Sequence, residues 1–133
     1  MSHRAWFSLC CAIIAGGCAQ LQTPPEESNY AVRMSALGER YLQCLSAEAE
    51  KARTTAAGAE EIALAAQGRC WSAWTAYQDA TKTSFLYGAE TPAEVQLATD
   101  KADAHLRQFE LESRRALVDR LVERALQGEK AAR

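Results

Sequence analysis

Catalytic and metal-binding motifs are scarce in this 133-residue sequence. It contains two histidines, and it has no HExxH zinc motif and no glycine-rich phosphate loop. His3 lies beside the N-terminus, and His105 stands next to Leu106 and Phe109 in a segment with helical spacing. A lone histidine in such a position is far more often a packing residue than a general base. We therefore predict a protein that is not an enzyme, with no catalytic residue, no metal site and no cofactor.

Long apolar runs are also absent after residue 18. The one such run, residues 5–17, follows His3 and Arg4 and is shorter than the roughly 20 residues that a membrane-spanning helix needs. A basic start, a short apolar stretch and small residues at its end are the marks of a secretory signal peptide. We predict that residues 1–17 are a signal peptide and that the mature protein is exported.

Small residues lead directly into Cys18. The segment ending Gly16-Gly17-Cys18 resembles the lipobox of bacterial lipoproteins, although Ala15 stands where that family prefers leucine. The resemblance implies that Cys18 carries a diacylglycerol and an acyl chain such as palmitate on its amine. It also implies a place in the cell envelope, at the periplasmic face of the outer membrane, because Ala19 rather than aspartate follows the cysteine. It covers the first 18 residues alone.

An ordinary signal peptide cut after Ala19 is the alternative. The sequence Gly17-Cys18-Ala19 is also a small-x-small cleavage site, and such a cut would release a soluble periplasmic or secreted protein. Lipid on Cys18 is favoured because no other segment of the chain offers a membrane anchor.

Two cysteines remain for the mature domain. Of the five in the sequence, Cys10 and Cys11 belong to the signal peptide and Cys18 is the lipid site, which leaves Cys44 and Cys70. An isolated pair in an oxidising compartment usually forms a disulfide, and two buried thiols are the alternative. One remaining histidine and two cysteines do not make a tetrahedral metal site.

Helix signals dominate the rest of the chain, which is rich in Ala, Leu, Glu, Arg and Gln. Thr23 and Thr91 each precede a proline and stand three residues before a glutamate, which marks two helix starts. The segment from Thr54 to Gly58 is typical of a turn, and Gly88 suits a left-handed helix end. We predict helices over 24–53, 59–87 and 92–127 within one domain of residues 24–128, preceded by a linker at 18–23 and followed by a tail at 129–133.

Apolar residues recur at steps of three and four in each predicted helix, as in a coiled coil. This spacing predicts an all-α fold, an elongated antiparallel three-helix bundle. The three rows are Tyr30, Met34, Leu37, Tyr41 and Cys44; Ala63, Ala66, Cys70, Trp74 and Tyr77; and Val95, Ala98, Ala102, Leu106, Phe109, Ser113, Leu117 and Leu121.

The positions of the two mature cysteines agree with this arrangement. Cys44 and Cys70 both lie in the apolar rows, and residue 57, midway between them, falls in the predicted turn. Residues equidistant from a hairpin turn face each other, so we predict a Cys44–Cys70 disulfide across the first hairpin. Closing a loop of this length contributes about 3 kcal/mol to stability.

An aromatic group on the second predicted helix is the first candidate interaction surface. Trp71 is rotated about 100° from Cys70 and leaves the apolar row. It either faces the third helix or, together with Phe85 or Tyr87, forms a patch that binds a partner.

The last predicted helix holds the second candidate surface. Arg114 and Arg115 belong to its mildly basic C-terminal half, whereas Leu121 and Val122 belong to an apolar face that is wider than one helix seam requires. That face either closes the end of the bundle or docks a partner or a second copy, so a homo-oligomer remains open.

These features together indicate a non-catalytic, lipid-anchored envelope protein. We expect an adaptor or accessory subunit of a secretion, conjugation or wall-associated assembly, with the membrane and an envelope protein as partners. The alternative is an inhibitor or binding protein of an envelope enzyme, presenting Trp71 or the arginine-rich end. Acidic residues interleave with the arginines, so nucleic-acid binding is not expected.

Overall fold

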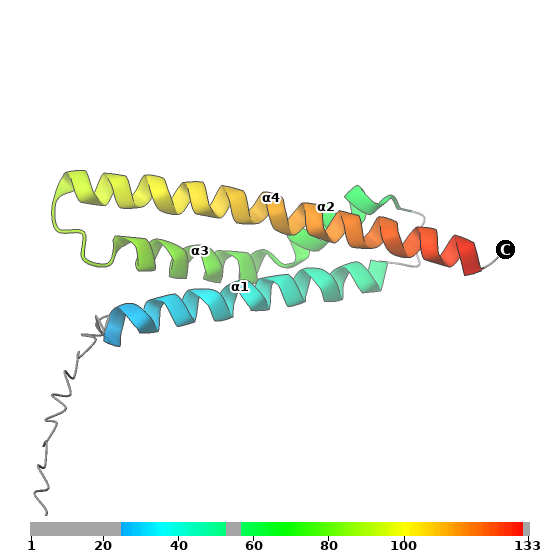
Figure 1. Cartoon of the computed structure of the whole chain (residues 1–133), viewed down its shortest axis with the longest axis horizontal. Helices are drawn as coiled ribbons and strands as arrows, with labels where there is room; N and C mark the ends of the chain where they lie inside the picture. Colours follow the sequence, from blue (N-terminus) through cyan, green and yellow to red (C-terminus); the bar gives the residue numbers. More distant parts are fainter. Residues whose placement is uncertain (1–24, 53–56, 132–133) are drawn as a thin grey trace, which may run out of the picture.

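The computed structural model describes residues 25–52 and 57–131. These residues contain four α-helices and no strand. They are α1 (Pro25–Ala52), α2 (Ala59–Arg69), α3 (Trp71–Leu86) and α4 (Pro92–Ala131). α1 runs along the elongated molecule, α2 and α3 return beside it, and α4 passes back along the full length (Figure 1). The all-α prediction is confirmed.

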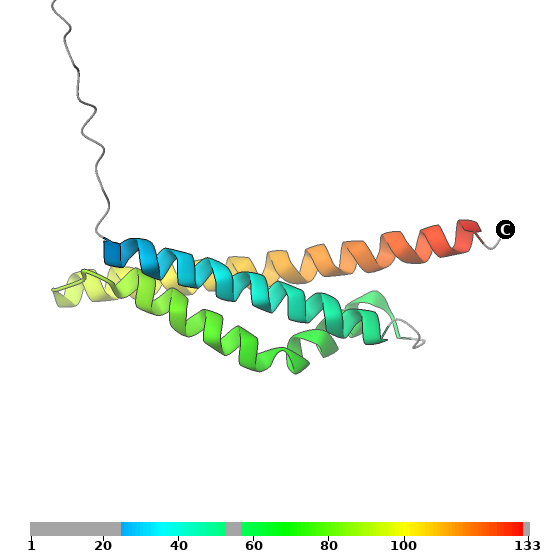
Figure 2. The same cartoon turned by 90° about the horizontal axis from the view of Figure 1, so that it is seen from below.

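The predicted single helix over 59–87 is wrong, and the predicted three-helix bundle is not confirmed, because the described residues form four helices. The helix breaks at Cys70, whose φ of −92° and ψ of 16° depart from helical values. Gly68 and Ser72 flank the break, and residues of these types are where helices commonly kink. α2 and α3 therefore meet at an angle (Figure 2) and pack as two helices against α1 and α4.

Local sequence signals place the helix ends around the second turn. Gly88 has a φ of 78°, the left-handed conformation expected of it. The Glu94 carboxylate accepts hydrogen bonds from the Thr91 backbone N–H at 2.9 Å and the Glu90 N–H at 3.1 Å, while the Glu94 N–H donates to Thr91 Oγ1 at 3.3 Å. This is the predicted capping box of α4. The other predicted cap, Thr23, and most of the turn beginning at Thr54 lie outside the described residues.

The capping box makes stability depend on pH. Hydrogen bonds from Thr91 and Glu90 hold the pKa of Glu94 below its ordinary value of 4.5. The stabilisation is therefore present above pH 4.5 and is lost as the pH falls through the lowered pKa of the folded state. We expect Glu94→Gln to be less stable than wild type near pH 6 and the difference to shrink toward about pH 3, measured by urea denaturation. An unchanged difference over this range would contradict the role of the charge.

The core follows the predicted apolar rows closely. Tyr41, Ala63, Ala66, Cys70, Trp74, Tyr77, Ala98, Ala102, Leu106 and Leu117 are buried, together with Leu45 and Ile62, which the rows omitted. Val95 departs from its row and is exposed. α4 begins beyond the start of α1 (Figure 1), so its first turn has fewer helices to pack against.

An aromatic cluster fills the middle of the core. The Trp74 ring lies 5.1 Å from Tyr41 and stacks on Phe109, and Tyr77 lies 4.5 Å from Phe109. Gly38 permits this packing, because a Cβ there would stand 3.2 Å from a Tyr77 ring atom. Burial raises the pKa of both Tyr41 and Tyr77.

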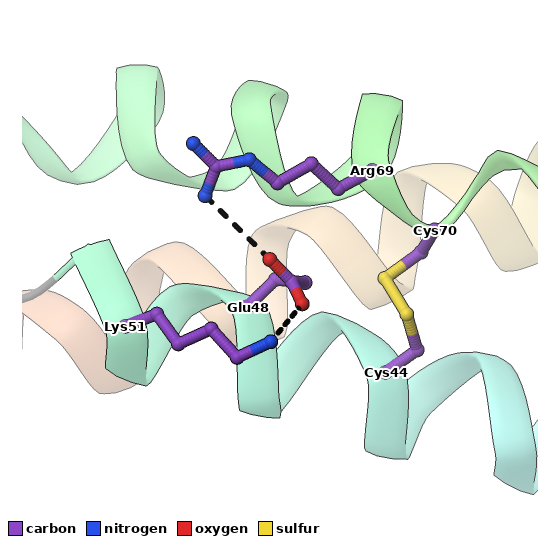
Figure 3. Close-up of polar contacts among 5 residues, drawn as sticks. All are labelled: Cys44, Glu48, Lys51, Arg69 and Cys70. Atoms are coloured by element: carbon purple, nitrogen blue, oxygen red, sulfur yellow. Dashed lines mark hydrogen bonds and ion pairs between the residues drawn. A yellow bond between two sulfur atoms is a disulfide. The ribbon is translucent and has the colours of Figure 1, made fainter.

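A disulfide and an ion-pair group join α1 to the second arm of the hairpin. The sulfur atoms of Cys44 and Cys70 lie at bonding distance, 2.00 Å, with the Cα atoms 5.9 Å apart. This is the predicted pairing. About one helical turn away, the Glu48 carboxylate pairs with Lys51 at 2.5 Å and with Arg69 at 3.6 Å (Figure 3). Lys51, with a smaller effect from Arg69, holds the pKa of Glu48 below its usual range.

Candidate docking surface

The C-terminal part of α4 continues past the helices that it packs against. α4 has 40 residues and α1 has 28, so their lengths are about 60 Å and about 42 Å. The last turns of α4 extend beyond the end of α1 and the start of α2 (Figures 1 and 2). Leu117 is buried, Leu121 is half-buried, and Val122 and Leu126 are exposed. The apolar face of α4 therefore becomes more exposed to solvent toward its C-terminus.

An open groove lies where α4 leaves the bundle. We call it the distal groove; it has a volume of about 1030 Å³ and lies between α4 and the segment that starts α2. On the α2 side of the groove, Gly58 and Ala59 have little or no side chain to fill the space, and Ile62 adds apolar surface. Its other lining residues are Ala57, Leu121, Val122, Arg124, Ala125, Leu126, Gln127 and Gly128. The surface is thus mainly apolar, with polar groups near the C-terminal end.

Polar contacts hold α4 against α1 beside the groove. The Arg124 guanidinium pairs with Glu50, and Arg120 Nη1 donates to Ser46 Oγ at 3.4 Å. The charge of Arg124, which also lines the groove, is therefore balanced by a carboxylate. These contacts are at least partly exposed, so they contribute little to stability, but they orient the apolar face of α4.

Leu121 and Val122, two residues of the predicted interaction surface, both line this groove. Arg114 and Arg115 line a different hollow of about 430 Å³, together with Glu60, Leu111, Glu112, Val118 and Asp119. Three carboxylates accompany the two guanidinium groups there. The hollow has no excess of positive charge to favour an anionic partner.

Trp71 and Phe85 do not form one patch. They are 14 residues apart in α3, about 21 Å along the helix. Trp71 is exposed rather than packed on α4. The alternative in which Trp71 faces the third predicted helix is therefore wrong. Phe85 is half-buried, with its ring 5.7 Å from His105.

His105 belongs to the aromatic cluster. Its Nε2 is hydrogen-bonded to the Tyr77 hydroxyl at 2.8 Å, and its ring lies near both Phe85 and Phe109. These contacts are those of a packing residue, the role expected from its position next to Leu106 and Phe109. The described residues hold no group of three His, Cys, Asp or Glu side chains arranged to bind a metal ion.

Sequence reasoning missed the α2 side of the distal groove. Ile62 lies outside the predicted row of its helix, and Gly58 was interpreted as part of a turn. The sequence signal for the groove is the apolar spacing that continues in α4 beyond Leu117. The predicted third helix is longer than the other two, so they cannot cover all of its apolar face.

Cys18, the signal segment 1–17 and the linker 18–23 lie outside the described residues. Within the described part of the chain, no helix has both the length and the apolar character needed to cross a membrane. No protein-family model, curated protein or solved structure is significantly similar to this chain.

Proposed function

We propose that the protein is a lipid-anchored adaptor of the cell envelope that docks a partner protein in the distal groove. The observation that carries the proposal is the apolar face of α4, which runs on past its own bundle to Leu121, Val122 and Leu126. Grooves that combine exposed apolar side chains with a few polar groups are common sites for ligands and partner helices. The lipobox-like sequence at Cys18 supports the anchor.

The two ends of the molecule have different places in this proposal. Cys18 precedes α1 by six residues, which span at most about 25 Å from the cysteine to Pro25. α1 then runs about 42 Å to the end beyond which α4 extends (Figure 1), and the residues that line the groove lie at that end. A lipid on Cys18 holds the start of α1 near the membrane and leaves the groove facing away from it.

The occupant that fits the groove is an amphipathic helix of an envelope protein. Leu117 and Leu121, four residues apart, pack against the core, and Ala125, four residues further on, continues this row into the groove. A partner helix would continue the same packing, and the small residues Gly58 and Ala59 allow its backbone to come close.

Photo-crosslinking in intact envelopes tests the proposal. We expect a benzoylphenylalanine at Val122 to crosslink one defined envelope protein and the same group at Leu64 not to do so. Leu126→Glu should weaken the purified complex at least about tenfold, because it places a charge in the apolar contact. Leu64→Glu is the matched control, since Leu64 is 53% exposed against 54% for Leu126 and does not line the groove.

Two results would overturn the adaptor. Equal crosslinking from Val122 and Leu64 would mean that the groove is not a specific site. A crosslink from Val122 to a second copy of the chain would replace the adaptor with a homo-oligomer.

The exposed Trp71 supports a second candidate, an inhibitor of an envelope enzyme. Its side chain is 63% exposed at the start of α3, and large exposed aromatic side chains commonly anchor protein complexes. Inhibition of a wall hydrolase or protease that Trp71→Ala abolishes and Leu126→Glu leaves intact would favour this candidate over the adaptor.

A further inference from the structure

Exposed apolar side chains surround the end of the molecule at which α1 begins. The start of α1, the end of α3 and the start of α4 meet at this end (Figures 1 and 2). Half of the large apolar side chains that are exposed in the described residues lie in these three segments: Val32, Leu86, Tyr87, Val95 and Leu97. We call this the apolar end.

Two tyrosines join the helices at the apolar end. The ring of Tyr30 on α1 lies 5.1 Å from the ring of Tyr87, directly after α3. Tyrosine combines an apolar ring with a polar hydroxyl, and it is enriched where proteins meet the boundary between lipid and water. The pair therefore suits a surface that enters the interface of a bilayer without crossing it.

The described chain begins at this same end. Residues 18–24 lead to Pro25 and cannot reach further than about 25 Å from Cys18. A membrane attached at Cys18 is consequently within reach of the apolar end. The distal groove is about 40 Å away, because Leu97 and Val122 are 25 residues apart on α4.

Acidic side chains at the apolar end disfavour a bilayer of anionic lipids. Glu90 and Glu94 are exposed beside the turn between α3 and α4. Of the exposed basic side chains at this end, Lys82 pairs with Asp103, which leaves Arg33 beside Val32 against the two carboxylates. Hydrogen bonds from Thr91 and Glu90 hold the pKa of Glu94 low, so that carboxylate stays charged at neutral pH. Carboxylates are repelled by anionic lipid surfaces, which attract basic segments instead. A zwitterionic bilayer carries no such penalty.

We propose that the apolar end rests in the headgroup region of a zwitterionic lipid bilayer, so that the bundle stands on the membrane with the distal groove facing outward. The proposal rests on the lipid anchor of the proposed function for how the protein reaches the membrane. The contact itself is a property of Val32, Leu86, Tyr87, Val95 and Leu97.

A tethered reporter assay tests the contact without the native lipid. Residues 18–133, with Cys18→Ser and a histidine tag before residue 18, are held on phosphatidylcholine vesicles that contain a nickel-chelating lipid. Tyr87→Trp and Val122→Trp are the two reporters, because these positions are similarly exposed, 40% and 45%, at opposite ends of the molecule. Brominated phosphatidylcholine then reports which tryptophan reaches the bilayer. The same chain without a reporter corrects for Trp71 and Trp74.

We expect Tyr87→Trp to shift its emission to the blue and to lose most of it to brominated lipid, with Val122→Trp unchanged. Adding Leu97→Glu should reduce the quenching of Tyr87→Trp, and adding the control Leu64→Glu should not. Replacing part of the lipid by phosphatidylglycerol should also reduce it. No quenching of Tyr87→Trp, or equal quenching of both reporters, would overturn the contact. The mass of the natural protein separately tests lipid on Cys18, so failure of the anchor and failure of the contact give different results.

Discussion

Trp74→Ala should lower the free energy of unfolding by about 3–5 kcal/mol, the usual cost of emptying a large aromatic site in a core. Trp74 is 6% exposed. Its ring lies 5.1 Å from Tyr41 and 5.8 Å from Tyr77, and it stacks on Phe109. The cavity would open between three helices that cannot all close onto it. Urea denaturation followed by circular dichroism measures the loss.

Trp71→Ala is the matched control. It removes the same side chain three residues earlier in α3, where 63% of it is exposed. We expect its effect to stay within about 0.5 kcal/mol, as for most surface substitutions. Equal losses from the two variants would mean that α3 does not present Trp74 inward and Trp71 outward. A Trp71→Ala protein that is as stable as wild type but no longer inhibits an envelope enzyme would instead point to a binding role for this side chain.

Removal of the disulfide is the second large effect. We expect Cys44→Ala/Cys70→Ala to lower the free energy of unfolding by about 3 kcal/mol, because opening the 26-residue separation restores freedom to the unfolded chain. Alanine is chosen because Cys70 is fully buried, and a serine hydroxyl there would need a hydrogen-bond partner. Urea denaturation of the oxidised wild type and the double variant measures the difference.

A reductant provides the control for the disulfide. It should lower the stability of the wild type to near that of the double variant and leave the double variant unchanged. A wild type that does not respond to reduction would show that the two thiols are not bonded in the protein. Because α2 and α3 meet at Cys70, we also expect the reduced protein to lose protection from hydrogen exchange first on either side of this residue.

The ion-pair group beside the disulfide adds less. Glu48, Lys51 and Arg69 pair at the surface, where such contacts are typically worth little. The disulfide therefore constrains how α1 faces the α2–α3 arm more strongly than these ion pairs do. The Arg124–Glu50 pair, which joins α4 to α1 beside the distal groove, is also exposed to solvent and likewise adds little.

Local patterns in the sequence were sufficient for several features of the fold. Helical content, the capping box at Thr91 and Glu94, the left-handed Gly88 and the Cys44–Cys70 pairing all agree with the structure. Each depends on residues close in sequence or on the symmetry of a hairpin about its turn. Such features follow from backbone geometry and the spacing of apolar residues, which a single sequence displays directly.

Only the tertiary structure decided where the helices break and where they end relative to one another. The apolar row through Cys70 is the same for a straight and a bent helix, so the sequence could not reveal the break between α2 and α3 or the exposure of Trp71. It also could not show that Ile62 and Gly58 face Leu121 across an open groove. Periodicity tells which residues share one face of a helix, but the neighbour that covers this face depends on the unequal lengths and packing angles of all four helices.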